Sequence, residues 1–142
     1  MNPSWQLWAV LSATFAALTA IFAKVGVEGI NADFATFIRT VVIVVALGAI
    51  LSGTGQWQSL GAVSGRSYLF LVLSGLATGA SWLCYFRALQ LGDAARVAPI
   101  DKLSVVMVAT FGVVFLGETL SLPNWLGIAM IAAGALLVAW RG

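Results

Sequence analysis

The chain has 142 residues, of which 61% are hydrophobic and 8% charged, with no histidine and a mean hydropathy of +1.03. This composition lies outside the range of soluble globular domains and identifies an integral membrane protein. The net charge of +2 provides no basic run for nucleic acid, and the lack of histidine argues against the usual metal sites. We therefore expect no nucleic-acid partner, no metal and no cofactor.

The apolar residues form blocks long enough to cross a bilayer, separated by short polar segments. A transmembrane barrel would instead need strands of about ten alternating residues. The pattern predicts an all-α membrane protein with five transmembrane helices. Their expected bounds are about residues 5–23, 34–52, 68–86, 97–116 and 125–140.

The stretch from residue 93 to residue 118 organises the rest of the chain. It predicts one long helix, with Asp93 as a plausible N-cap and Gly117 near its end, about 36 Å long at 1.5 Å per residue. Asp101 and Lys102 then lie two turns inside this helix, below the lipid headgroups. Charges at that depth are costly unless they face protein or water, so this pair is a candidate functional site.

Two cations on the first two predicted helices are candidate partners of this pair. Lys24 follows a stripe of small residues and lies either at a packed or cavity-facing position or as a snorkelling residue at the helix end. Arg39 shares a face with Thr36 and Thr40, and we expect it to face the protein, with snorkelling as the alternative. Pro99 either introduces a kink that serves as a gate beside the charge pair or only shapes the helix start.

The third predicted helix carries a continuous polar stripe on an otherwise apolar span. Such a stripe either lines a pathway or holds helices together. Gly75 and Gly79 form a GxxxG motif on the neighbouring face, where another helix can approach closely. Arg87 points away from the stripe, and we interpret it as a snorkelling residue at the interface. The stripe consists of Ser74, Thr78, Ser81 and Tyr85.

The last part of the chain contains one further candidate carboxylate. Glu118 follows Gly117, and we expect its side chain to accept hydrogen bonds from the N-terminal amides of the last helix. That helix has Ala129 and Ala133 four residues apart, with Gly134 beside them. It is interpreted as a packing or dimerisation helix.

With these features in place, the chain resembles one half of a drug/metabolite transporter of the EamA type. The likeness covers almost the whole chain, so residues 1–142 are expected to form a single EamA-like transmembrane domain. It is carried by FIRTVVI, LSGLATGASWLCYFRALQLGDAARVAPI, VVFLGETLS and NWLGIAMIAAGALLVA.

The resemblance implies a fold built from two inverted repeats of five helices each, which enclose a central substrate cavity. A chain with one repeat would rebuild this fold as an antiparallel homodimer. Arg39 and Glu118 match positions that are commonly charged in the family. The chain departs from the family pattern at Thr119, where a basic residue is common, and at Asp101 and Lys102, where many relatives are apolar.

The leading hypothesis is a secondary transporter of a small zwitterionic or anionic metabolite, such as an amino acid, in a prokaryotic inner membrane. It would export this substrate by alternating access, with the polar stripe and Trp82 lining the cavity. Asp101 and Glu118 are the candidates for proton coupling, because a low-dielectric environment favours a protonated carboxyl group. The predicted gate network consists of Lys24, Arg39, Asp101 and Lys102.

Two other hypotheses stay open. The chain is either an accessory or structural subunit, for example a heterodimer partner, or a parallel homodimer without transport of its own. An enzyme is not expected, because the sequence offers no pairing of a nucleophile with a base, no metal set and no phosphate-binding loop.

Overall fold

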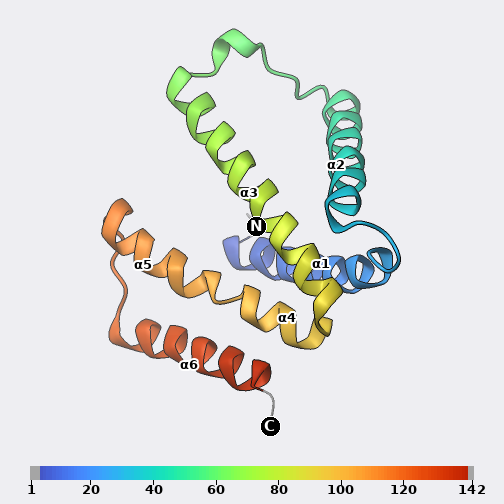
Figure 1. Ribbon diagram of the computed structural model, residues 1–142. Coiled ribbons are helices and arrows are strands. Elements are labelled where there is room, and N and C mark those ends of the chain that lie inside the picture. The colour runs from blue at the N-terminus through green and yellow to red at the C-terminus, as the bar shows by residue number, and fades with distance from the viewer. Residues whose placement is uncertain (1–3, 141–142) are drawn as a thin grey trace. The chain divides into compact units, whose positions relative to one another are not determined.

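The computed structural model describes residues 4–140, and in this part of the chain it contains helices, turns and loops but no strand. The helices follow one another along the chain, as the colours of Figure 1 show. They are α1 (Trp5–Gly26), α2 (Ala32–Thr54), the short 3-10 helix η1 (Leu60–Ala62), α3 (Gly65–Leu91), α4 (Ala94–Asp101), α5 (Ser104–Leu116) and α6 (Leu122–Ala139).

The helices supply five segments that are long and apolar enough to cross a membrane, with α4 and α5 together forming the fourth. This confirms the predicted all-α membrane fold with five spans. Most helices extend beyond the predicted bounds; α3, for example, runs from Gly65 to Leu91 where residues 68–86 were expected. In α3 the added residues include Arg66, Arg87 and Gln90, which lower the hydropathy at the ends of the span but continue the helix.

The prediction of one continuous helix from Asp93 to Gly117 is wrong. The α-helical hydrogen-bond ladder is interrupted at Lys102 and Leu103, which separate α4 from α5. There the N–H of Leu103 donates to the carbonyl of Ile100 at 3.0 Å, three residues back instead of four. The interruption lies beside the charged pair and three residues after Pro99.

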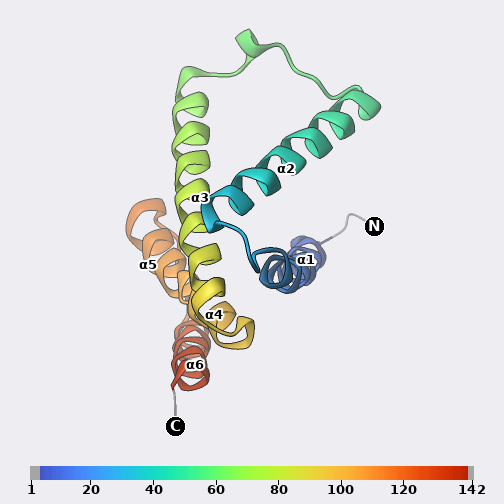
Figure 2. The same cartoon turned by 45° about the vertical axis from the view of Figure 1, so that its right-hand side comes forward.

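The chain divides into two compact units, one formed by residues 23–90 and the other by residues 4–22 with residues 91–140. The boundary falls within α1, close to its C-terminal end. In the first unit, α2 and α3 approach each other where α2 begins and separate toward the loop that contains η1 (Figures 1 and 2).

The start of α2 is fixed by a side-chain cap. The Oδ1 atom of Asn31 accepts hydrogen bonds from the backbone N–H groups of Asp33, at 2.9 Å, and Phe34, at 3.1 Å. Asparagine is among the preferred residues at this position because its side chain satisfies N–H groups that have no partner within the helix. Asp33 is in the first turn of α2 and therefore lies at the end of this helix that is close to α3.

In the second unit, α6 packs along α4 and, less extensively, along α5, and runs back in the opposite direction (Figure 1). The more covered side chains of α6 recur at spacings of three and four, which is one helix face. They include Ile128, Ala132, Ala135 and Ala139, of which Ala135 is buried. The small residues Ala129 and Ala133 are exposed, so they lie outside this intramolecular contact.

Most large apolar side chains are exposed in the single chain. The buried residues are few and mostly small, and the largest fully buried side chains are Leu89 and Val27. Large residues in the middle of spans, such as Val44 on α2 and Leu76 on α3, are about two-thirds exposed, at 65% and 67%. Lipid can cover such surfaces, and so can other membrane helices.

Candidate functional site

A stacked arginine and tryptophan connect α2 and α3. The guanidinium carbon of Arg39 lies 3.3 Å from the centroid of the Trp82 ring, in the geometry of a cation–π contact. Trp82 makes edge-on ring contacts with Tyr85, at 5.5 Å, and Phe86, at 5.9 Å, between centroids. The structure therefore brings Arg39, Trp82 and Tyr85 together, although the sequence placed them in two different roles.

Arg39 has no acidic partner in this arrangement. Within residues 4–140 no carboxylate lies within ion-pair distance of its guanidinium, and the side chain is half-buried. The aromatic ring covers one face of the guanidinium plane and leaves its N–H groups at the edge. An unpaired guanidinium on an aromatic surface is suited to bind a carboxylate or phosphate in its own plane.

The remaining polar residues of α3 are open to the outside of the chain. Ser74, Thr78 and Ser81 are exposed, and the hydroxyl of Thr78 donates to the backbone carbonyl of Ser74 at 2.8 Å. Tyr85 is half-buried beside Trp82. That these residues line a substrate cavity stays a prediction, and it requires a partner surface opposite them.

Lys24 interacts with the C-terminal end of α3. Its ammonium donates to the carbonyl of Leu89 at 2.7 Å, where a cation also interacts favourably with the helix dipole. The side chain lines a pocket of about 330 Å³, together with Val27, Glu28, Gly29, Leu89 and Gln90. The amide of Gln90 donates to the carbonyl of Ile30 at 2.7 Å and so ties α3 to the loop before α2.

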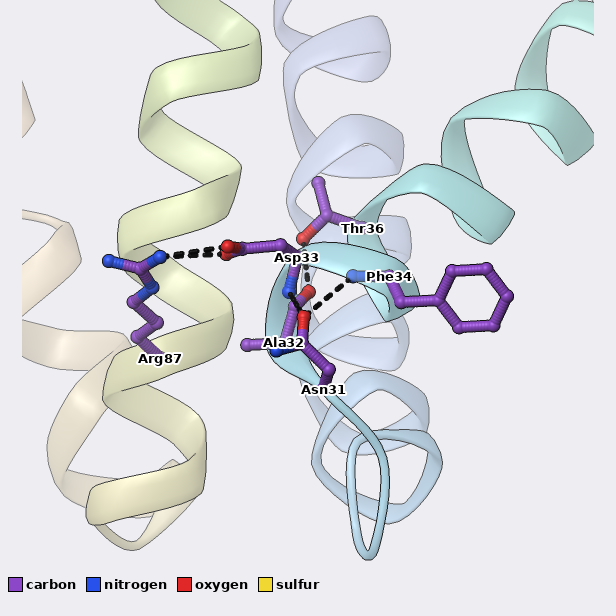
Figure 3. Close-up of polar contacts among 6 residues, drawn as sticks. All are labelled: Asn31, Ala32, Asp33, Phe34, Thr36 and Arg87. Atoms are coloured by element: carbon purple, nitrogen blue, oxygen red, sulfur yellow. Dashed lines mark hydrogen bonds and ion pairs between the residues drawn. The ribbon is translucent and has the colours of Figure 1, made fainter.

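An ion pair that the sequence did not indicate joins α2 to α3. The Nη2 atom of Arg87 lies 2.8 Å from Oδ2 of Asp33, and Figure 3 shows the two side chains pointing toward each other. Our interpretation of Arg87 as a snorkelling interface residue did not include this partner. Both side chains are largely exposed, so the pair orients the two helix ends and contributes little stability.

Asp101 and Lys102 also pair, at the break between α4 and α5. The Nζ atom of Lys102 lies 3.1 Å from Oδ2 of Asp101. Asp101 is the last residue of α4, and Lys102 begins the two-residue interruption. Lys24 and Arg39 belong to the other unit, so the predicted gate network among these four residues stays a prediction.

Glu118 folds back onto α5. Gly117 ends that helix in the left-handed conformation, with φ of 70°, which glycine adopts without strain. The N–H groups of Gly117 and Glu118 both donate to the carbonyl of Gly112. A Cβ atom placed on Gly112 would lie 2.6 Å from Oε2 of Glu118, so the carboxylate occupies the space that a side chain would fill.

The predicted role of Glu118 as a cap for the last helix is therefore wrong. Ser121 is the N-cap residue of α6, and within the described residues no amide of that helix donates to the Glu118 carboxylate. The left-handed turn at Gly117 directs the side chain toward α5 instead. The sequence analysis did not identify Gly112. The signal available was a glycine near the end of the same helix, six residues before Glu118.

Comparison with known proteins agrees with this architecture. The chain matches the profile of the EamA-like transporter family over residues 3–140. The class of protein is therefore a multi-pass membrane transporter, and the chain belongs to the EamA-like transporter family. The bacterial relatives described next fit a location in the inner membrane.

Among the relatives, an uncharacterized transporter encoded in the cobO 3′ region of a Sinorhizobium species is 72% identical over 139 residues, which cover 98% of this chain and 99% of that protein. The uncharacterized transporter YxxF of Bacillus subtilis is 28% identical over 136 residues, covering 95% of this chain but 42% of that protein. A probable 4-amino-4-deoxy-L-arabinose-phosphoundecaprenol flippase subunit, ArnE, of Yersinia pestis is 31% identical over 72 residues, 51% of this chain and 63% of that protein. No solved structure is significantly similar to the chain.

Proposed function

We propose that the chain is a secondary transporter that works by alternating access as an antiparallel homodimer. The observation that carries this proposal is that almost the whole chain corresponds to less than half of a longer transporter, YxxF. Two copies supply the amount of chain that the longer relative has in one. The wide exposure of apolar side chains on α2 and α3 leaves room for the second copy.

The substrate is a small zwitterionic or anionic metabolite, such as an amino acid. Arg39 supports this class, because it has an aromatic contact on one face and no carboxylate partner within residues 4–140. A substrate carboxylate can complete its hydrogen bonds. Trp82 and Tyr85 supply an adjacent apolar surface for the rest of the molecule.

The gates are formed by the charged residues near the ends of the helices. In an antiparallel dimer one copy of this cluster lies at each face of the membrane, so closing one gate while the other opens exchanges the roles of two identical chains. Export is driven by protons, which bind to Asp101 or Glu118. The gate residues are Lys24, Arg39, Asp101 and Lys102.

A second candidate function is supported by the relative named as a flippase subunit. In this alternative the chain is one component of a membrane complex and its charges hold the helices in register. The match covers 51% of this chain and 63% of that protein, so it is shorter than the matches that span almost the whole chain. The transport assay below separates the two functions.

The purified chain, reconstituted alone in liposomes with a proton gradient, is expected to exchange radiolabelled amino acids across the membrane. The gradient should accelerate this flux, and a protonophore should return it to the rate of exchange without a gradient. A cationic probe, tetraphenylphosphonium, should not be transported, because the site carries unpaired positive charge. Absence of flux for every amino acid from the chain alone, with flux restored by a co-purified second subunit, would contradict the homodimer and support the subunit function.

A further inference from the structure

Two carboxylates are candidates for proton coupling, and their surroundings differ. This inference rests on the proposed function and decides between them. Asp101 lies beside a cation, since Oδ2 of Asp101 is 3.1 Å from the ammonium of Lys102. Asp101 therefore already has a cationic partner within the chain.

Glu118 lies in different surroundings. Its side chain is exposed in the single chain and makes no ion pair and no hydrogen bond within residues 4–140. The carboxylate rests on the backbone of Gly112, where a Cβ would come within 2.6 Å of Oε2 and 3.3 Å of Cδ. The carbonyl of the same glycine accepts the N–H of Glu118 at 3.1 Å, so Gly112 fixes both the backbone and the side chain of this residue.

This contact places the carboxylate deeper than its sequence position suggests. Glu118 follows the end of α5, but Gly112 lies four residues before Leu116, about 6 Å inside the span at 1.5 Å per residue. Around Gly112 the helix presents apolar side chains, including Phe111 and Phe115, whose ring centroids are 5.8 Å apart. The carboxylate is therefore held beside an apolar part of the span, a setting in which an ionisable group is a candidate functional site.

No charged side chain faces this position from the packed helices. Neither α5 (Ser104–Leu116) nor α6 (Leu122–Ala139) contains a charged residue. The other charged residues described in this unit are Asp93, Arg96, Asp101 and Lys102. All four precede α5, whose length of about 20 Å separates them from its C-terminal end.

We propose that Gly112 is a positioning residue whose missing side chain holds the Glu118 carboxylate within the span, and that Glu118 is the group that binds the coupling proton. The proton adds to one carboxylate oxygen when the site is open to one side of the membrane and leaves when it is open to the other. Asp101 stays paired with Lys102 throughout this cycle.

Labelling with dicyclohexylcarbodiimide tests the proposal without knowledge of the substrate. This apolar reagent forms a stable adduct with protonated carboxyl groups inside membranes, and mass spectrometry of peptides from the full chain in liposomes measures the adduct at each residue. Glu118 should be labelled several-fold more than Asp101, because Asp101 is paired with Lys102 and Glu118 has no such partner within residues 4–140. Glu118→Gln should remove the adduct at that position.

The positioning role is tested by two variants that move the carboxylate. Gly112→Ala displaces it, and Glu118→Asp shortens the side chain by one methylene so that it no longer reaches the glycine. Both should reduce labelling at residue 118 several-fold. Gly127→Ala on α6 is the matched control, because a Cβ there meets no atom within 4 Å.

Equal or stronger labelling of Asp101 would overturn the assignment of the proton site, and unchanged labelling in both displaced variants would overturn the role of Gly112. If Gly112→Ala does not fold, Glu118→Asp decides the second question. Labelling as predicted in a protein whose flux ignores the proton gradient would contradict proton-coupled transport and leave the position of Glu118 standing. Flux that is driven by the proton gradient in a protein whose Glu118 is not labelled would support proton-coupled transport and contradict Glu118 as the proton site.

Discussion

Replacement of Arg39 by glutamine is expected to lower amino-acid transport by roughly 10- to 100-fold, because a hydrogen bond to a charged group contributes roughly 1.5–3 kcal/mol. The protein should remain folded and dimeric. Arg39 has no carboxylate partner within residues 4–140, so its removal strands no buried acid. Its contact with Trp82 is expected to be replaced in part by the amide side chain of glutamine.

Exchange of radiolabelled amino acids in liposomes measures this effect, with helical content and oligomeric state recorded for each variant. Arg39→Lys should fall between the wild type and the glutamine variant, because an ammonium lacks the planar fork that binds a carboxylate at two points. Arg66→Gln is the matched control. Arg66 is also on a membrane helix but interacts only loosely with an aromatic ring, at 5.9 Å from the centroid of Phe70. Equal losses for Arg39→Gln and Arg66→Gln would contradict a substrate-binding role for Arg39.

Gly79→Leu on α3 is expected to weaken the dimer by about tenfold or more, equivalent to about 1.4 kcal/mol, while the single chain stays folded. A Cβ placed on Gly79 or on Gly75 meets no atom within 4 Å, so the chain itself has room for a larger side chain. Only a second chain packed against the GxxxG face would be displaced. Single-molecule counting of labelled chains in lipid bilayers at several protein densities measures the change.

The matched control for this prediction is Gly53→Leu on α2. Gly53 also opens onto empty space in the single chain but lies near the end of its helix and outside any GxxxG motif. It should leave the monomer–dimer equilibrium unchanged. Dimers of undiminished stability in Gly79→Leu would show that this face of α3 is not the interface.

The fold could largely be predicted from hydropathy, because five long apolar blocks have few arrangements other than five spanning helices. The interruption between α4 and α5 could not. Leu103 and the residues around it fit a helix well, and Pro99, which lacks a backbone N–H, lies three residues before Lys102, where the interruption begins. A hydrophobic pattern indicates which residues lie in lipid. It does not indicate where the backbone hydrogen bonds of a helix change their spacing.

The candidate site was predicted residue by residue but not in its contacts. Arg39 and Trp82 were both candidates from the sequence, but their stacking depends on where the two helices approach each other, which one sequence does not specify. Similarly, Arg87 pairs with Asp33, which lies two residues after the helix cap at Asn31, and the sequence pattern did not indicate this pair. Long side chains have several rotatable bonds, so their partners are set by how the helices pack. The hydrophobic periodicity of the sequence does not specify that packing.

Topology tests the central claim, the antiparallel homodimer, most directly. The single cysteine, Cys84, is replaced by serine, one cysteine is added after Gly142, and a membrane-impermeant thiol reagent is applied to intact cells. We predict that about half of the chains are labelled, because an antiparallel dimer needs both orientations in equal numbers. Labelling close to zero or close to complete would mean a fixed orientation, and the mechanism with two exchanging gates would be contradicted.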